Sequence, residues 1–276
     1  MSTTIPRQSG TCLDRILVQT AKDVEMRKAL ISDEALREKA SQQPAPVDFE
    51  RALTQRNVTV IAEIKRASPS KGTFPGSIVP SEIASAYIAG GAAGISCLTD
   101  EPFFKGTLTD LEVVSRVGFA ASPPVGVLRK DFMIDRFQID EARAFGASCI
   151  LLIVAALDDP ALVDLQSYAK ELGLSVLVEI HNEAEAERAM TAGATLIGIN
   201  NRDLHSFHVD IATTERLAPQ LPSETTTVGE SGISTPEDVA RLAASGIHAV
   251  LVGESLILQT DRLAATKALA GVVREG

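Results

Sequence analysis

Residues 60–72 read Val-Ile-Ala-Glu-Ile-Lys-Arg-Ala-Ser-Pro-Ser-Lys-Gly, an apolar run that passes into a polar, cationic loop. An apolar run bounded by polar residues predicts a buried β-strand over residues 58–65. Side chains alternate along a strand, so Glu63 and Lys65 point to the same side of the sheet. The loop that follows is cationic and rich in serine. An acid and a base at a strand end favour a functional site, although a salt-bridged pair at a solvated strand end gives the same pattern.

Strands and helices alternate along the rest of the chain. The predicted strands cover residues 58–65, 94–98, 125–129, 149–155, 175–180, 196–199, 225–228 and 249–252. The predicted helices cover residues 81–89, 108–117, 138–145, 161–172, 183–192, 211–218, 236–244 and 262–273. Eight strand–helix units in succession predict an α/β fold, a (β/α)8 TIM barrel. An open doubly wound sheet would usually have a glycine-rich fingerprint after its first strand, and none is present.

A weak internal repeat supports the barrel. In each connection that enters an even-numbered strand, a glycine precedes an apolar β-branched residue by four positions. The pairs are Gly91 and Ile95, Gly146 and Ile150, Gly193 and Ile197, and Gly246 and Val250. Each glycine is expected to end the preceding helix in a left-handed cap.

An N-terminal helical extension, residues 1–48, precedes the barrel, which we assign to residues 49–276 within a single domain overall. Residues 11–40 have helical periodicity. Residues 41–47 contain two prolines and end the extension, which we expect to pack on an end of the barrel. The apolar stripe of the extension consists of Leu13, Ile16, Leu17 and Leu30.

Composition narrows the class of partner and the compartment. The net charge of −10 argues against nucleic acid or an anionic membrane as a partner, but local Lys and Arg still allow an anionic small ligand. The three cysteines are unclustered, as is typical of a reducing compartment. Residues 1–8 lack the apolar centre of a signal peptide, and the longest apolar run, residues 149–157, is too short to span a bilayer. We expect a cytoplasmic protein, either a monomer or a weak homo-oligomer.

Polar side chains follow most of the predicted strands. In barrels of this class the chemistry lies at the C-terminal ends of the strands. Buried charges are costly without a partner or a ligand, so their convergence at one end predicts a functional mouth. The residues at these ends are Glu63, Lys65, Thr99, Asp100, Arg129, Lys130, Asp131, Glu179, Asn200, Asn201, Arg202, Glu230, Ser231, Gly232, Gly253, Glu254 and Ser255.

Glycine-containing turns after the last two strands predict a phosphate site. Residues 228–234 and 250–255 allow backbone N–H groups to approach an anion, and a short helix is expected to start at Gly253. Barrel closure would bring the loop of residues 66–71 beside them.

The histidines and the aromatic residues give weaker evidence for a functional site. The four histidines do not form a zinc-ligand set with the cysteines, so no metal is expected, and His205 and His208 are expected to be solvated. Phe103, Phe104 and Phe132 follow the second and third strands, and they suit either the core or a flat apolar ligand.

These motifs, in this order and spacing over residues 12–270, resemble the indole-3-glycerol phosphate synthase family. The resembling segments are residues 61–70, 96–100, 128–132, 177–181, 197–204, 229–233 and 252–256. The resemblance implies closure of 1-(2-carboxyphenylamino)-1-deoxyribulose 5-phosphate to indole-3-glycerol phosphate with loss of carbon dioxide and water. It implies no metal or organic cofactor, because the amino-substituted ring is electron-rich.

The resemblance also implies roles for individual residues. Lys130 would be the general acid, with a pKa lowered by an apolar mouth and nearby cations. Glu179 would stabilise positive charge on the anilino nitrogen and later help to remove a proton, and Glu63 and Lys65 would handle the hydroxyl that leaves as water. The sequence does not decide how acid and base duties divide among these four residues. Lys65 would also hold the substrate carboxylate. Asn200 and Ser231 would hydrogen-bond the substrate hydroxyls, supported by Glu230 and Arg202. The anthranilate ring would contact Phe104, Phe132 and Leu204. The phosphate would be bound by Ser68, Gly232, Gly253 and the N–H of Glu254, with Arg66 or Lys71 nearby.

Three residues depart from the family pattern. Thr107 and Asn201 stand where serine is frequent, and Asn201 would slightly alter contacts to the carboxylate. Glu254 stands where a serine is expected in the phosphate loop, so its carboxylate must point away from the phosphate.

Other barrel functions remain open from the residues alone. A Schiff-base aldolase would use Lys130 as its nucleophile. A phosphoribosyl isomerase would need a Cys/Asp pair at strand ends, and Cys97 lies inside a strand instead. A non-catalytic phosphate sensor would keep the glycines without the acid and base residues.

Overall fold

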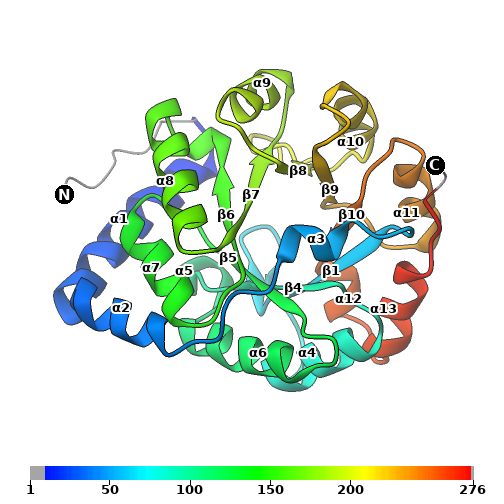
Figure 1. The fold of residues 1–276 in the computed structure, drawn as a ribbon. Coiled ribbons are helices and arrows are strands. Elements are labelled where there is room, and N and C mark those ends of the chain that lie inside the picture. The colour runs from blue at the N-terminus through cyan, green and yellow to red at the C-terminus, as the bar shows by residue number, and fades with distance from the viewer. Residues whose placement is uncertain (1–9, 275–276) are drawn as a thin grey trace.

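The computed structural model of the chain describes residues 10–274, and its centre is a closed barrel of parallel strands (Figure 1). Around the barrel the strands follow the order β1-β10-β9-β8-β7-β6-β5-β4. This arrangement confirms the predicted (β/α)8 barrel. The strands are β1 (Thr59–Ile64), β4 (Gly94–Leu98), β5 (Gly126–Lys130), β6 (Cys149–Ile153), β7 (Ser175–Ile180), β8 (Leu196–Asn200), β9 (Thr226–Glu230) and β10 (Ala249–Val252).

Helices surround the barrel and correspond to the predicted ones, with ends shifted by up to three residues. They are α4 (Pro80–Ala89), α6 (Leu108–Ala120), α7 (Arg136–Ala144), α8 (Asp159–Glu171), α9 (Glu183–Thr191), α10 (Ala212–Leu217), α11 (Pro236–Ala243) and α13 (Arg262–Ala270). The glycine caps are confirmed, because Gly91 and Gly146 have φ of 89° and 84°. Only glycine adopts this left-handed conformation without strain, so the chain can turn directly into the next strand.

Most of the short elements were not predicted from the sequence. A two-stranded hairpin, β2 (Ala67–Ser68) and β3 (Gly72–Thr73), follows β1, and two further 3-10 turns, Val154–Ala156 and Ala218–Gln220, join helices to strands. The helix α5 (Glu101–Phe104) follows β4. The predicted helix after Gly253 is present as α12 (Glu254–Ile257).

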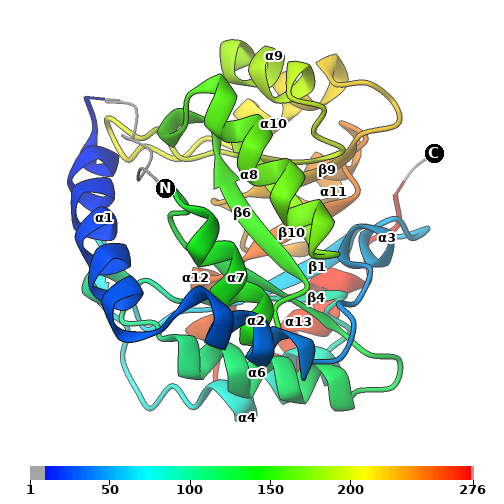
Figure 2. The same ribbon diagram turned by 60° about the vertical axis from the view of Figure 1, so that its left-hand side comes forward.

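The N-terminal extension consists of two helices where the sequence predicted one helical segment. The break between them is at Ser32, which is the N-cap of α2 (Asp33–Ser41). The Ser32 side chain accepts a hydrogen bond from a backbone N–H in the first turn of α2. The preceding helix is α1 (Cys12–Leu30), and its last residue, Leu30, is 86% exposed, so its assignment to the apolar stripe was wrong. Figure 2 shows α1 and α2 lying against α7. Their contact is a small apolar cluster of Val24, Leu36, Phe137 and Ala144.

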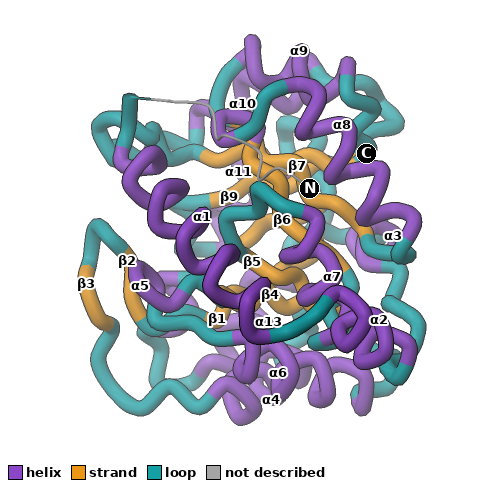
Figure 3. Tube along the Cα trace, turned by 90° about the vertical axis from the view of Figure 1, so that its left-hand side faces the viewer, coloured by secondary structure: helices purple, strands orange, loops and turns teal. Residues whose placement is uncertain are grey.

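The two ends of the barrel are closed differently. At the N-terminal ends of the strands, α3 (Phe49–Leu53) inserts Phe49 against Gly94 and Gly126, where an added Cβ would come within 2.7 and 2.9 Å of its ring. At the opposite end α1 lies beside the β2–β3 hairpin and the strand ends (Figure 3). The chain that precedes β1 therefore contributes to both ends of the barrel.

Within residues 10–274 no helix combines the length and the apolar character needed to cross a membrane. The prediction concerning a signal peptide falls on residues 1–8, which lie outside the described part of the chain.

Candidate active site

A cavity of about 650 Å³ lies at the C-terminal ends of the strands. Fifteen of the sixteen site residues proposed from the sequence line it. They are Glu63, Lys65, Ser68, Phe104, Lys130, Phe132, Glu179, Asn200, Arg202, Leu204, Glu230, Ser231, Gly232, Gly253 and Glu254. Parallel strands place their C-terminal residues at one end, so side chains from β1, β5, β7, β8 and β9 meet there.

Lys130 is the cationic centre of the cavity. Its Nζ lies 2.6 Å from Glu230 Oε2 and 3.1 Å from Glu179 Oε2, and its side chain is 13% exposed. The three residues come from β5, β7 and β9. Barrel closure therefore gathers one ammonium and two carboxylates that are far apart in sequence.

The electrostatics of this cluster correct one expectation from the sequence. Burial alone would lower the pKa of Lys130, but Glu230, Glu179 and Glu63 together outweigh it, so the pKa is raised. Lys130 is thus a stable ammonium in the free protein. Burial raises the pKa of Glu230 to about 7, because the attraction of Lys130 is opposed by the negative charge of Glu179. The pKa of Glu179 is lowered, since Lys130 and His181 outweigh its burial.

Glu63 and Lys65 form a second acid–base pair. Glu63 Oε1 lies 2.8 Å from Lys65 Nζ, which confirms that the two side chains share a side of β1. A Cβ on Gly253 would come within 2.3 Å of Glu63 Oε1 and 2.9 Å of Lys65 Nζ. Gly253 thus gives the pair room at the mouth, apart from any contact of its N–H with a ligand.

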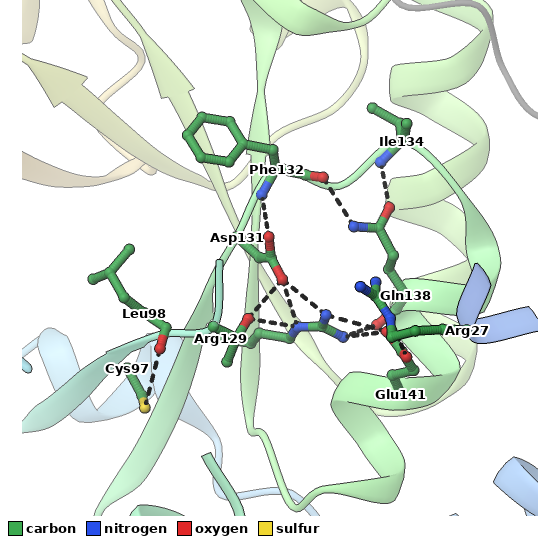
Figure 4. Close-up of polar contacts among 10 residues, drawn as sticks. Arg27, Cys97, Leu98, Arg129, Asp131, Phe132, Ile134, Gln138 and Glu141 are labelled. Carbon is green, nitrogen blue, oxygen red and sulfur yellow. Dashed lines mark hydrogen bonds and ion pairs between the residues drawn. The ribbon is translucent and has the colours of Figure 1, made fainter. Parts of the chain in front are cut away.

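Arg129 and Asp131 flank Lys130 but belong mainly to a buried network behind it (Figure 4). Arg129 is 1% exposed, and its guanidinium donates to Asp131 Oδ2 (2.8 Å), Glu141 Oε2 (3.2 Å) and the carbonyl of Gln138 (2.7 Å). Since neighbouring side chains on a strand point to opposite sides, Arg129 faces α7 while Lys130 faces the cavity.

The same network fixes the residue after the strand. Asp131 Oδ1 accepts a hydrogen bond from the N–H of Phe132, and Gln138 donates to the carbonyl of Phe132. Arg27 of α1 joins the network through Glu141, at 2.7 Å. The residues on both sides of Lys130 are therefore held by side chains of α7 and α1.

The loops after β1, β9 and β10 form the end of the cavity where the sequence predicts phosphate binding. Ser231 and Gly232 both line the cavity and have φ of 68° and 80°, so the chain turns sharply there. Glu254 forms an ion pair with Lys71, Oε1 to Nζ 3.4 Å, and its N–H is in the first turn of α12. Its carboxylate is therefore engaged with the β2–β3 hairpin.

Arg66 is the one proposed site residue that the fold does not bring to the cavity. Both of its terminal nitrogens donate to the carboxylate of Asp110, and one also donates to the carbonyl of Lys105. Its assignment to the phosphate is therefore corrected: the guanidinium anchors the hairpin to α6. Sequence spacing could not reveal this, because Asp110 lies in a different strand–helix unit.

The apolar end of the cavity is larger than the sequence predicted. The rings of Phe104 and Phe132 lie 6.0 Å apart and are tilted by 38°. Leu13 and Ile16 of α1 also line the cavity, although they were not predicted to belong to the site. Their only signal was membership of the apolar stripe, which is equally consistent with simple packing.

Two polar residues after β8 have separate functions. Asn200 lines the cavity and accepts a hydrogen bond from the N–H of Arg202. Asn201 is buried, where it donates to the carbonyl of Ser231 and accepts from Thr214. The expectation that Asn201 alters contacts to a substrate carboxylate is corrected, because its amide holds the loop after β9 instead.

Other predictions concern residues outside the cavity. His205 and His208 are exposed, as expected. Cys97 is fully buried inside β4, so it is not an acid at the mouth.

Comparison with known proteins points to one family. A family model described as indole-3-glycerol phosphate synthase matches residues 13–269. The indole-3-glycerol phosphate synthase of Roseiflexus sp. (strain RS-1) is 46% identical over 265 residues, which are 95% of this chain and 98% of that protein. That of Streptomyces griseus subsp. griseus is 47% identical over 253 residues, 92% of each chain.

Among solved structures, a 3-hexulose-6-phosphate synthase matches with a TM-score of 0.61 at 17% identity, over 78% of this chain and 100% of that one. A thiamine phosphate pyrophosphorylase from Pyrococcus furiosus matches with a TM-score of 0.59 at 14% identity, over 79% and 95%. At these identities the likeness concerns the barrel fold alone.

Proposed function

Since this chain belongs to the indole-3-glycerol phosphate synthase family, we propose that the residues around Lys130 carry out the reaction of that family. The chain closes 1-(2-carboxyphenylamino)-1-deoxyribulose 5-phosphate to indole-3-glycerol phosphate, with loss of carbon dioxide and water. The observation that carries our assignment of roles is the Lys130 ammonium between Glu179 and Glu230 inside the cavity.

Lys130 is the general acid of ring closure. As the aromatic carbon attacks the ribulose carbonyl, negative charge develops on the carbonyl oxygen, and a nearby ammonium can donate a proton to it. The raised pKa keeps Lys130 protonated at neutral pH, so the donor is present before substrate binds. The same charge state makes Lys130 a poor nucleophile, which disfavours a Schiff-base aldolase.

The other polar residues of the cavity stabilise charge on the intermediate, assist the loss of water and bind the substrate. Glu179 stabilises the charge that develops on the anilino nitrogen. Glu63 and Lys65, 2.8 Å apart, act on the hydroxyl that leaves as water, and Lys65 also holds the substrate carboxylate. Asn200 and Ser231 hydrogen-bond the substrate hydroxyls, with Glu230 and Arg202 in support.

The two ends of the cavity orient the substrate. Phe104, Phe132 and Leu204 hold the anthranilate ring, and Leu13 and Ile16 extend that apolar surface. The phosphate is bound by Ser68, Gly232, Gly253 and the N–H of Glu254, with Lys71 as the nearby cation.

The Lys130→Met variant tests the central role. We expect turnover to fall by about 10² or more, because the variant removes the proton donor while keeping an apolar stem of similar length. The chain contains no Trp, so the indole fluorescence of the product can be followed without background. The matched control is Lys267→Met, at an exposed lysine of α13, which should keep full turnover. Unchanged turnover in Lys130→Met would remove this residue from the role of acid.

Three broader features are also proposals. The extension of residues 1–48 and the barrel of residues 49–276 form one domain, in keeping with the α1 and α2 contacts to α7. The protein acts in the cytoplasm, and it is a monomer or a weak homo-oligomer. Size-exclusion chromatography with light scattering measures the last of these directly.

A further inference from the structure

His181 lies just behind the cluster of Lys130, Glu179 and Glu230. It follows β7 directly, and its side chain is 8% exposed. Its Nε2 lies 3.4 Å from Glu179 Oε1, and its Nδ1 lies 3.0 Å from Glu185 Oε2. Glu185, near the start of α9, also accepts a hydrogen bond from the His181 N–H at 2.8 Å. Glu185 thus orients the imidazole through hydrogen bonds, while Nε2 approaches Glu179 as an ion-pair contact and has no hydrogen-bond partner among the described residues.

This contact distinguishes two carboxylates that otherwise resemble each other. Glu179 and Glu230 both bind Lys130, but only Glu179 has His181 as a second cationic partner. The remaining oxygen of Glu230, Oε1, is buried without a hydrogen-bond partner among the described residues. It faces Gly198, where a Cβ would come within 2.1 Å. A carboxyl group with one unpartnered, buried oxygen is better suited to carry a proton than a carboxylate with a cation close to each of its oxygens, as Glu179 has in Lys130 and His181.

We propose that His181, oriented by Glu185, is a positioning residue that keeps Glu179 permanently ionised and so makes Glu230 the carboxyl group that exchanges protons with Lys130. The inference rests on the roles proposed above for Lys130 and Glu179.

The pKa directions agree with this geometry. Burial would lower the pKa of His181, but Glu179 and Glu185 raise it to about 10, so the imidazole is a cation at neutral pH. The pKa of Glu179 is lowered and that of Glu230 is raised to about 7. Two neighbouring carboxyl groups whose pKa values are driven apart can divide the duties of fixed charge and proton carrier.

Other charged groups nearby do not replace His181. In the cavity, Glu63 of β1 interacts electrostatically with Lys130. On α9, the guanidinium of Arg188 is held by Asp159 and by the carbonyls of Val154 and Leu157. The other charged residues around the outer side of His181 are Arg202, Asp203, His205, His208, Asp210 and Arg216, of which Arg216 pairs with Glu183.

The proton balance of the reaction gives Glu230 a defined task. When Lys130 donates a proton to the substrate oxygen, the neutral amine that remains no longer donates to Glu230 Oε2, 2.6 Å away. Rotation of the Glu230 carboxyl group about its Cγ–Cδ bond then brings the proton on Oε1 to the amine, leaving a carboxylate and an ammonium. Because the substrate carboxylate leaves as neutral carbon dioxide, each turnover takes up one proton overall. Glu230 regains its proton from solvent, while Glu179 stays charged opposite the anilino nitrogen.

The first test is the pH dependence of turnover in His181→Gln. Glutamine keeps a hydrogen-bonding side chain and removes the positive charge, so the pKa of Glu179 should rise. We expect the acid limb of the turnover profile to move upward by about one pH unit or more, with little change in KM above pH 8. Glu185→Gln should move it in the same direction by less. The control is His205→Gln, at an exposed histidine, which should leave the profile in place.

The second test observes the imidazole in the intact protein by nuclear magnetic resonance. The chain has four histidines, so the His181 signal can be assigned by elimination with His205→Gln, His208→Gln and His248→Gln even if His181→Gln fails to fold. We expect it to titrate near pH 10, far above the usual histidine value of about 6.5.

The outcomes separate this inference from the proposed function. A His181 signal that titrates near pH 6.5 or below, or an unmoved acid limb in a folded His181→Gln, would overturn the inference while leaving the roles of Lys130 and Glu179 intact. Full turnover in Lys130→Met would instead remove the proposed function on which the inference rests.

Discussion

Gly198 shows how a single missing side chain shapes the acid–base cluster. A Cβ at this position would lie 2.1 Å from Glu230 Oε1 and 3.2 Å from a methyl group of Leu177, so Gly198→Ala must displace the Glu230 carboxyl group. We expect turnover to fall at least tenfold and stability to drop by about 1–3 kcal/mol, as for other overpacked interiors. Gly271→Ala is the matched control, because its nearest neighbour would be 3.5 Å away. Equal turnover in the two variants would show that Glu230 tolerates the shift.

Glu179→Gln separates charge from shape at the second carboxyl group. Glutamine has nearly the same size, but it cannot stabilise positive charge on the anilino nitrogen. Turnover should fall by about 10² with KM changed only a few-fold, since Lys130 keeps its contact with Glu230. Steady-state kinetics followed by indole fluorescence measures both constants, with the exposed Glu183→Gln on α9 as control. A rise in KM with unchanged turnover would assign Glu179 to substrate binding only.

The sequence predicts which residues reach the mouth better than it predicts their charge states. Alternation along β1 is enough to place Glu63 and Lys65 together, because Lys65 directly follows the last residue of the strand. The pKa of Lys130 was predicted in the wrong direction, since its dominant neighbours, Glu179 and Glu230, come from other strands at distances that no spacing rule provides. Arg66 was misassigned for the same reason.

At the scale of elements, the Arg129 network supports the end of β5. Replacing Arg129 by Met would leave the buried Asp131 carboxylate without its ion-pair partner and Glu141 with Arg27 alone. Removing one member of a buried charged network costs about 3–5 kcal/mol, and we expect a loss of this size in urea unfolding. Arg136→Met is the control, because Arg136 is 43% exposed and its pair with Asp164 should contribute less than about 1 kcal/mol. Similar losses of unfolding free energy in both variants would mean that the buried Arg129 network stabilises the fold no more than an exposed ion pair does.

The elements that the sequence missed are short. The strands and flanking helices were predictable because each has several residues of period 2 or 3.6. The helix α5 has four residues, and β2 and β3 have two each. Elements this short do not repeat a helical or strand pattern of apolar residues often enough to be recognised. The break between α1 and α2 has a local signal in Ser32, an N-cap residue, but the apolar positions on either side mask it.

At the scale of the whole molecule, barrel closure follows from eight repeated units, but the location of the N-terminal extension does not. Its helices are joined to the barrel by contacts from α7, such as the pair of Lys28 with Asp135 at 2.6 Å. Nothing in residues 11–40 indicates that Leu13 and Ile16 reach the cavity while Val24 packs on α7. Which face of an amphipathic helix meets which surface is decided by three-dimensional packing.

The pH dependence of stability is a property of the whole molecule with a predictable sign. The pKa of Asp100 is raised by burial to about 6, that of Glu230 to about 7, and that of His181 to about 10 by its two carboxylates. Between about pH 4 and pH 10 the folded state therefore binds more protons at these groups than the unfolded state, so their contribution is lost as pH rises. Asp131 and Glu179 have lowered pKa values, so the stability they add is lost only as pH falls below about 4.

We therefore expect the free energy of unfolding to be larger at pH 5.5 than at pH 8.5, by on the order of 2 kcal/mol. The net charge of −10 at pH 7 acts in the same direction, because protonation reduces repulsion between carboxylates. His248, whose pKa is lowered by burial, opposes the trend only near pH 6.5. Urea unfolding at fixed ionic strength measures the difference, and the double variant His181→Gln with Glu230→Gln should flatten it. Greater stability at pH 8.5 would mean that these buried groups do not hold their protons in the folded protein.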